Sequence, residues 1–440
     1  MGLENILFIV AFAAAVFLFS KNLKAIIRNI NLGRDIDLSD NKAERWKKML
    51  LVAVGQSKMV VKPVSGLMHI IVYAGFVIIN IEVLEIIIDG ILGTHRIFAA
   101  PLGSFYNFLI GSFEILALLV LVAITVFFVR RNFMTIKRFG MKEMLGWPKT
   151  DANIILIVEV LLMGAFLSMN AADQILQARG VEHYAVAGSY PVSQFLVPTL
   201  EGFSNGTLVS LERGTWWFHI LGILTFLNYL PYSKHFHIML AFPSVFYSSL
   251  KPKGEFDNMD SVKKEVALMF DPDADPYAAP AEPEGPIERF GAKDVTDLNW
   301  KQLMDSYSCT ECGRCSEQCP ASQTGKLLSP RKIMMDTRDR VEEVGKNIDK
   351  KGKEFSDGKS LLGDYITEEE LWACTTCNAC VDACPIELNP LSIIMDMRRS
   401  LVMEESKIPS ELAGMITNIE NNGAPWQFSQ TDRANWINEE

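Results

Sequence analysis

Apolar residues fill five long blocks in the first 250 positions of the chain. Each block reaches the roughly 20 residues that a helix needs to cross the hydrocarbon core of a bilayer. The blocks cover residues 3–22, 64–90, 106–129, 152–175 and 214–233, and the last stays apolar to about residue 250. This pattern predicts a five-helix transmembrane bundle in residues 1–250.

Basic residues are spread unevenly over the connections between these blocks. The second and fourth connections hold only Arg96, Arg179 and Arg213. The first and third are rich in Lys21, Lys24, Arg28, Arg34, Lys42, Arg45, Lys47, Lys48, Lys58 and Lys62, and in Arg130, Arg131, Lys137, Arg138, Lys142 and Lys149. Because Lys and Arg accumulate in cytoplasmic loops, we expect an inner-membrane protein with its N-terminus outside and everything after residue 250 in the cytoplasm. Binding of anionic lipid is an alternative use of these side chains.

The chain becomes polar after residue 250. Residues 251–295 are acidic and carry Pro272, Pro276, Pro280, Pro283 and Pro286, a composition typical of an extended tether.

Residues 296–440 show helix signals, among them a capping box from Thr367 to Glu370. A repeat places a capping residue and a proline at Ser329–Pro330 and again at Asn389–Pro390. The alternating charges of 341–360 predict a solvated excursion rather than a docking surface. The fold class is therefore all-α.

Composition agrees with a membrane half and a polar half. The chain is 49% hydrophobic with a net charge of −10. It has no basic stripe with interleaved aromatic residues, so we expect no nucleic-acid partner. The start Met1-Gly2-Leu3-Glu4 lacks the basic region of a signal peptide, and the first apolar block is expected to be retained.

All eight cysteines lie in two copies of the motif C-x2-C-x2-C-x3-C-P, at 309–320 and 374–385. This spacing is typical of domains with two [4Fe-4S] clusters, in which the fourth cysteine of each run ligates the other cluster. It predicts one metal-binding set of Cys309, Cys312, Cys315 and Cys384, and a second set of Cys374, Cys377, Cys380 and Cys319. Structural zinc and disulfides are the alternatives, but zinc sites usually show two separated C-x2-C pairs. Disulfides need an oxidising compartment.

Three histidines of the membrane half are candidate cofactor ligands. His219 and His237 are 18 residues apart, five helical turns, so we expect them on one face of the fifth helix. His69 and His237 then lie at matching depth near the cytoplasmic side and can supply both axial ligands of a haem b. His235 should point to the other side of the helix. The alternative is an interfacial His237 and a hydrogen-bonded His69.

Acidic residues inside the apolar blocks are costly and therefore candidate functional groups. Of Glu82, Glu85, Glu114 and Glu159, we favour Glu82 and Glu114 as carboxylates that take up protons at a quinol site. An ordinary hydrogen bond between helices is the alternative for each of them.

The stretch His69-Ile-Ile-Val-Tyr-Ala-Gly-Phe, with His219 and His237 downstream, resembles the cytochrome b (gamma) subunit of respiratory nitrate reductases. The resemblance implies five spans and two haems, with His69 and His237 on the cytoplasmic-side haem. His219 corresponds to a ligand of the outer haem, but its partner would stand at Ile79. His219 facing a quinone is therefore the alternative to a second haem.

The cysteine half resembles the all-helical ferredoxin-like domain of the C-type subunit of heterodisulfide reductase and of the iron–sulfur subunits of succinate and anaerobic glycerol-3-phosphate dehydrogenases. The chain as a whole resembles a fusion of this domain with the membrane cytochrome. The resemblance implies that such proteins continue into, or associate with, a module bearing C-C-G cysteine clusters that performs the terminal chemistry. Since no Cys-Cys pair occurs and no cysteine follows Cys384, we expect the substrate-converting centre on a separate cytoplasmic C-C-G-type protein or flavoprotein.

These features predict an electron-transfer subunit that connects a membrane quinone (menaquinone is expected), haem b and two [4Fe-4S] clusters with that partner. No catalytic side chain is expected, because the cofactors carry the chemistry. The alternative is a membrane anchor or assembly protein whose clusters are structural or regulatory.

Overall fold

The computed structural model describes residues 2–271, 289–432 and 434–438. Within these ranges the chain is helical, and its only β-type pairing is two isolated bridges. The expected tether over 251–295 is described only at its two ends. The prolines that predicted its extended course lie outside the described residues, namely Pro272, Pro276, Pro280, Pro283 and Pro286.

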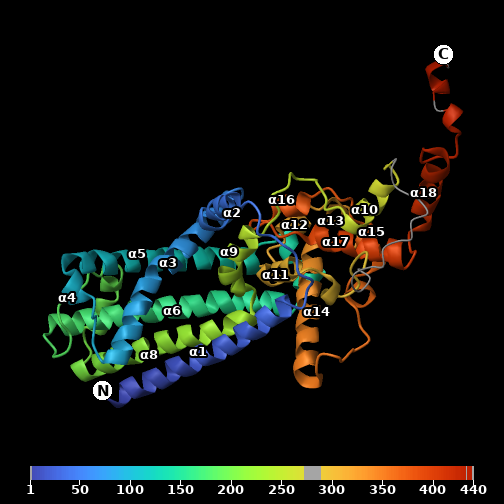
Figure 1. Cartoon of the computed structure of the whole chain (residues 1–440). Helices are drawn as coiled ribbons and strands as arrows, with labels where there is room; N and C mark the ends of the chain where they lie inside the picture. The colour runs from blue at the N-terminus through green and yellow to red at the C-terminus, as the bar shows by residue number, and fades with distance from the viewer. Residues whose placement is uncertain (1, 272–288, 433, 439–440) are drawn as a thin grey trace.

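The first half of the chain forms an elongated bundle of long helices that run back and forth between its two ends (Figure 1). Its helices are α1 (Leu3–Ile30), α3 (Pro63–Leu92), α5 (Ser104–Asn132), α6 (Trp147–Ala178) and α8 (Asn205–Tyr229). Helix α6 packs along α8 and α5, and α3 packs against α5. Buried apolar side chains such as Phe113, Phe166 and Ile220 fill the centre between them.

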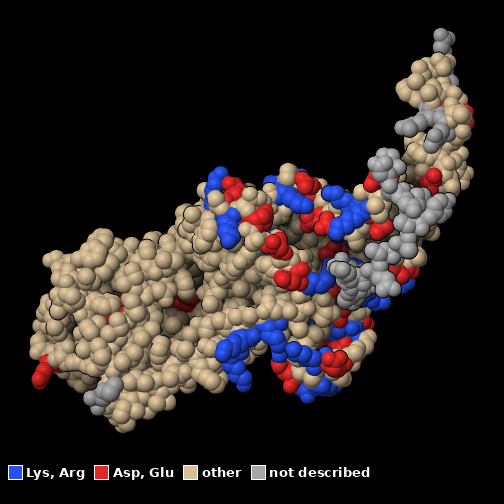
Figure 2. Space-filling model, viewed as in Figure 1, with Lys and Arg blue, Asp and Glu red and all other residues tan. Residues whose placement is uncertain are grey.

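Four of these helices, α1, α3, α5 and α6, are long and apolar enough to cross a membrane. The face of the bundle seen in Figure 2 is almost free of charged side chains, whereas Lys, Arg, Asp and Glu crowd the other half of the molecule. The protein is therefore membrane-anchored. The fifth expected span, 214–233, falls on α8, which is shorter, at 25 residues, and carries Glu212 and Arg213. The count of five spans stays a prediction.

The fifth helix ends earlier than the sequence predicts. Helix α8 stops at Tyr229, and two short 3₁₀ turns, η5 (Leu230–Tyr232) and η6 (Lys234–Phe236), follow before α9 (His237–Phe246) begins. Pro231 lacks the backbone N–H that a continuing helix would need. The expectation that His219 and His237 share one face of a single helix is thus wrong, because they lie on different helices.

The cysteine half is built from shorter helices, which gather at one end of the bundle except for α18, which extends away from the others (Figure 1). They are α11 (Trp300–Ser308), α12 (Arg314–Gln318), α13 (Pro320–Gln323), α14 (Pro330–Lys351), α15 (Glu368–Trp372), α16 (Ala379–Ala383), α17 (Pro390–Arg399) and α18 (Ser410–Asn422). Short helices elsewhere are α2 (Lys42–Met49), α4 (Ala99–Leu102), α7 (Val197–Leu200) and α10 (Asp260–Leu268).

The caps that the sequence predicts are present. The Asn389 side chain accepts the Ser392 N–H at 3.0 Å ahead of α17, and Pro390 is the first residue of that helix. Ser329 and Pro330 begin α14 in the same way. The Thr367 hydroxyl accepts the Glu370 N–H at 3.2 Å, which closes the capping box of α15.

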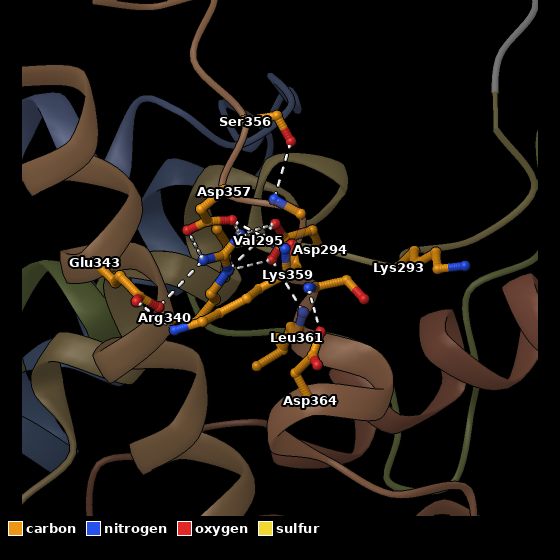
Figure 3. A network of polar contacts seen from close by, with 12 residues as sticks. Lys293, Asp294, Val295, Arg340, Glu343, Ser356, Asp357, Lys359, Leu361 and Asp364 are labelled. Carbon is orange, nitrogen blue, oxygen red and sulfur yellow. Dashed lines mark hydrogen bonds and ion pairs between the residues drawn. The ribbon is translucent and has the colours of Figure 1, made fainter. Parts of the chain in front are cut away.

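The predicted solvated excursion over 341–360 is wrong for its first part, because α14 continues to Lys351. Val341 and Gly345 are buried on this helix. The segment after α14 is tied back by the buried Arg340, which donates hydrogen bonds to Asp294 and Asp357 at 2.7 and 2.6 Å (Figure 3). Since guanidinium–carboxylate pairs at a buried site are strongly directional, this network holds the segment against the helix.

Both halves of the protein share one hydrophobic core. Ile26 and Ile30 from α1, together with Phe236, pack into the same cluster as the apolar residues of α11, α14 and α17. At this boundary α14 passes so close to α1 that a Cβ on Gly345 would lie 2.2 Å from the Asn29 amide oxygen. Asn29 in turn donates a hydrogen bond to the Tyr307 hydroxyl at 3.0 Å. The cysteine half is therefore packed directly onto the membrane bundle.

We predict that Gly345→Ala destabilises the protein by about 1–3 kcal/mol, because the added methyl group overpacks the contact with Asn29. Gly414→Ala on α18, where a Cβ meets nothing within 4 Å, is the matched control. It should be neutral or stabilising by up to about 1 kcal/mol from helix propensity. Thermal unfolding in detergent, followed by circular dichroism, measures both; equal melting temperatures would contradict the close contact.

Candidate functional site

The two cysteine motifs adopt the same backbone conformation. Glu311 and Thr376, the residues before the second cysteine of each motif, have φ values of 55° and 56°. Such left-handed conformations are unfavourable for residues with a side chain and cluster at functional sites. Their backbone N–H groups donate to the first sulfur of each motif, Cys309 Sγ and Cys374 Sγ, both at 3.4 Å. The sequence repeat is therefore also a structural repeat.

Gly313 shows why one position of the first motif needs glycine. Its φ is 72°, and an added Cβ would lie 2.3 Å from a nitrogen of the buried Arg331 guanidinium. Arg331 donates to the Arg138 carbonyl at 2.7 Å and to Glu143 at 2.8 Å, so it cannot move away freely. The motif is thus braced from behind by residues of the membrane half.

The structure brings Cys384 from the second motif to the first. One cavity is bordered by Cys309, Cys312, Cys315 and Cys384, with Cys380 also at its edge. Helices α12 and α16, which follow the central cysteines of each motif, pack against each other. Burial, together with nearby charge at Cys312, raises the pKa of the Cys384 thiol to about 12. These positions match the first predicted metal-binding set.

The second predicted set lies together as well. Burial raises the pKa of Cys380 to about 12, and charges at Cys374, Cys319 and Cys377 contribute to this pKa shift. Cys377 is exposed, whereas Cys319 and Cys380 are buried. The second set therefore reaches the protein surface.

The alternatives of disulfides and zinc fit this arrangement poorly. None of the eight cysteines is joined in a disulfide. Among the described residues, no three His, Cys, Asp or Glu side chains converge closely enough to hold one metal ion. Structural zinc needs four ligands at about 2.0–2.3 Å, whereas the four thiolates around a cubane each bind a different iron. Since the buried thiols favour protonation, insertion of a cluster would release protons.

His69 on α3 and His237 at the start of α9 lie side by side. Their ring centres are 6.4 Å apart with an angle of 44° between the ring planes. His69 Nδ1 is buried without a hydrogen-bond partner among the described residues, and His237 Nδ1 is 3.1 Å from the Lys234 carbonyl oxygen. Because a metal–imidazole bond is about 2.0 Å long, the spacing leaves room for one metal ion between the rings. The carbonyl contact occupies Nδ1 and leaves the other ring nitrogen of His237 available, as in histidines that bind a metal.

His235 is closer to this pair than the sequence predicts. Its ring centre is 5.5 Å from that of His237 and 5.4 Å from that of Phe226. The prediction that His235 points to the opposite side assumed a continuous helix. The 3₁₀ turn η6 brings both rings to the same region instead.

His219 stands apart from this group, deep in the bundle. It is 2% exposed, and its Nδ1 is 3.0 Å from the Leu162 carbonyl oxygen. Ile79, the position at which a second-haem ligand would stand, packs into the apolar core of the bundle. A second haem and a quinone contact both remain predictions for His219.

The two favoured carboxylates have different surroundings. Glu114 accepts hydrogen bonds from the backbone N–H groups of Val192 and Ser193 at 2.8 and 3.1 Å and from Asn170 at 3.1 Å. Glu82 is buried, and its Oε2 has no hydrogen-bond partner among the described residues. A satisfied carboxylate is typical of a structural role, so Glu82 is the stronger functional candidate.

Arg96 is the centre of a polar network in the bundle, a role that no sequence pattern indicated. It is buried and donates to Asp173 at 2.6 Å, Asn170 at 2.8 Å and the Tyr106 hydroxyl at 3.1 Å. The Tyr106 hydroxyl donates to Glu85 at 2.8 Å. In the sequence Arg96 looks like an ordinary loop residue, and only its folding back between helices reveals the network.

A comparison with known protein families identifies the kind of domain in the cysteine half. Residues 308–388 match the family model of the 4Fe-4S dicluster domain. The motif spacing, the shared backbone geometry and this match together define an iron–sulfur electron-transfer protein with two [4Fe-4S] clusters.

Individual relatives point to oxidoreductases. The chain is 29% identical over 465 residues to the probable iron-sulfur-binding oxidoreductase FadF of Bacillus subtilis, with 99% of this chain and 61% of the relative covered. It is 28% identical over 449 residues to the EtfAB:quinone oxidoreductase of Syntrophomonas wolfei, covering 97% and 58%. The chain thus spans about three fifths of the length of these two relatives. No solved structure matches it.

A third relative is similar to the cysteine half alone. It is the C-type subunit of the ferredoxin/F(420)H(2)-dependent CoB-CoM heterodisulfide reductase of Methanosarcina acetivorans. This relative is 31% identical over 119 residues, covering 27% of this chain and 60% of the relative. The expected similarity to heterodisulfide reductase is confirmed for this half. The resemblance of the membrane half to a nitrate reductase cytochrome stays a prediction.

We predict that Cys384→Ser removes the same cluster as Cys309→Ser, although Cys384 lies in the other motif. About four of eight irons should be lost in each variant, because each cubane holds four. Electron paramagnetic resonance of the reduced protein then shows the same remaining signal in both. Cys374→Ser, which belongs to the second set, should leave the other signal; a spectrum of Cys384→Ser that matches Cys374→Ser would contradict the exchange of ligands.

Proposed function

We propose that this chain is the membrane electron-transfer subunit of a quinone-linked oxidoreductase. Electrons pass between a membrane quinone and a cytoplasmic partner through haem b and two [4Fe-4S] clusters. The observation that carries the proposal is the meeting of His69 and His237 at the end of the bundle onto which the cysteine half is packed. An anchor with only structural clusters gives no reason for a half-buried histidine pair at this place.

His69 and His237 would hold the haem from two helices, α3 and α9. The haem supplies one-electron exchange at a potential set by its ligands and surroundings. The unpaired Nδ1 of His69 and the carbonyl contact of His237 fit ligation by neutral imidazoles.

Glu82 would exchange protons with the quinone. Oxidation of a quinol to a quinone breaks two O–H bonds and releases two electrons and two protons, and reduction reverses every step. A buried carboxylate with one free oxygen can take up such a proton and pass it on. Glu82 lies one helical turn from Glu85, which belongs to the Arg96 and Tyr106 network. Menaquinone is the quinone that we expect.

The partner would be an electron-transferring flavoprotein or a C-C-G-type iron–sulfur protein. Similarity over nearly the whole chain to a protein named EtfAB:quinone oxidoreductase supports the first. Similarity of the cysteine half to part of a heterodisulfide reductase supports the second. Electrons can run in either direction through such a chain of carriers.

We predict that His69→Ala abolishes the b-type absorption bands of the purified protein and the reduction of its clusters by a quinol analogue. His183→Ala, which changes a histidine of an outer connection, is the control and should keep both. Optical spectra and freeze-quenched electron paramagnetic resonance measure the two effects. A wild-type protein without b-type bands, or with clusters that quinol never reduces, would instead favour the membrane anchor.

We predict that Glu82→Gln slows quinol-driven cluster reduction about 10²-fold or more, as expected for loss of a proton acceptor. Chemical reduction of the clusters by dithionite should be unchanged, because it needs no proton transfer inside the bundle. Glu159→Gln on α6 removes a different carboxylate of the bundle as a matched control. If both variants react at the wild-type rate, the quinone exchanges protons elsewhere.

A further inference from the structure

A buried ion pair connects the membrane half with the first cysteine motif. The Lys234 ammonium, on turn η6, pairs with the carboxylate of Glu311. The two side chains are only 8% and 2% exposed. The Lys234 ammonium also donates to the Pro148 carbonyl at 2.6 Å, which fixes the turn against the start of α6. Burying a lysine and a glutamate is costly, and this cost is not needed to pack an apolar boundary.

Each partner of this ion pair is bonded to a predicted cofactor ligand. The Lys234 carbonyl oxygen is 3.1 Å from Nδ1 of His237. The Glu311 N–H donates to Cys309 Sγ at 3.4 Å. Two residues therefore link the histidine pair with a sulfur of the first motif.

Among the described residues the second motif makes no ion pair at the position of Glu311, although Lys58 of the membrane half donates to its Val381 carbonyl at 3.4 Å. Thr376 occupies the position of Glu311, with the same left-handed backbone and the same N–H to sulfur contact. Its hydroxyl donates to the neighbouring Thr375 carbonyl, at 2.7 Å. Since the backbone geometry forms equally well with threonine, the carboxylate of Glu311 is not required by the motif itself.

Other contacts from the membrane half also converge on the first motif. Arg314 of this motif donates to the Lys58 carbonyl at 3.3 Å, just ahead of the helix that carries His69. Glu317 accepts from Arg138 at 2.8 Å and pairs with Lys62. Several basic residues that the sequence assigned only to topology are thus bound to residues beside the cysteines.

We propose that the cluster of Cys309, Cys312, Cys315 and Cys384 is the one that exchanges electrons with the membrane site, and that Lys234 and Glu311 are positioning residues that couple the two. The cluster of Cys374, Cys377, Cys380 and Cys319 then faces the soluble partner through the exposed Cys377. This order of carriers rests on the proposed function. The expected effect of the Lys234 and Glu311 charges on the cluster potential, by contrast, does not require haem to be present.

The charges of Lys234 and Glu311 should shift the midpoint potential of the first cluster in opposite directions. Reduction adds a negative charge to a cluster, so a nearby cation favours the reduced form and a nearby anion disfavours it. At a buried site such charges are weakly screened. Lys234→Met should lower the midpoint potential of the first cluster, and Glu311→Gln should raise it. The double variant removes both charges of the pair but also takes from Arg338 the Glu311 carboxylate to which it donates at 2.9 Å. Its potential should fall between those of the two single variants.

The test is a redox titration of the purified full chain, followed by electron paramagnetic resonance. Cys315→Ser and Cys380→Ser assign the two cluster signals. Lys359→Met is the matched control, because Lys359 pairs with Glu343 at 2.7 Å at the solvent-exposed edge of the network in Figure 3. Iron content at the wild-type level shows that a variant is folded, and the double variant is available if a single change is not tolerated.

Opposite shifts of the first cluster in the two single variants, with the second cluster unmoved, support the proposal. Shifts on the second cluster, or shifts no larger than those of Lys359→Met, overturn it. In a protein that binds haem, Lys234→Met should also lower the potential of that haem. Absence of haem in the wild type would contradict the proposed function, while the cluster shifts would still decide the place of the ion pair.

Discussion

Apolar packing across the boundary between the two halves is the interaction on which the rest of the structure depends. Ile26, Ile30, Leu230 and Phe236 belong to the membrane half, yet they are buried in the same core as the helices around the cysteines. One-electron carriers must be held at a constant separation, and a continuous core does this better than a tether. The close passage of Gly345 over Asn29 shows how little space is left at this boundary.

Charges buried at the boundary have a different role from the apolar core. Pairs such as Lys234 with Glu311 contribute little net stability, because desolvation offsets most of their attraction. What these ion pairs contribute is an electrostatic field of fixed direction at the atoms beside them. The Arg96 network at the other end of the bundle follows the same rule, since one cation there is shared among Asp173, Asn170 and Tyr106. These buried polar groups thus lie at the two ends of the membrane bundle: the Lys234–Glu311 pair where the cysteine half packs onto it, and the Arg96 network at the opposite end.

The sequence predicted regular features well. Apolar blocks indicated the long helices, the caps at Thr367 and Asn389 are present, and the motif spacing agrees with the dicluster match. The prediction from the sequence failed where the fifth helix is interrupted and the chain changes direction. Pro231 ends α8, and the apolar composition on both sides of it hid the break. The roles of Arg96, Lys234 and Glu311 depend on contacts between residues far apart in the chain, so no local pattern could indicate them.

The short turn that replaces the predicted continuous helix affects how the histidine pair should respond to substitution of one of its members. It places two imidazoles, those of His235 and His237, with ring centres 5.5 Å apart. If His69 and His237 hold a metal ion, His235 offers a second imidazole close to the His237 side of that site. Helix α3, by contrast, carries His69 alone. The two sides of one metal site would then differ in redundancy, and His69 is the position at which a single substitution has no nearby replacement on its own helix.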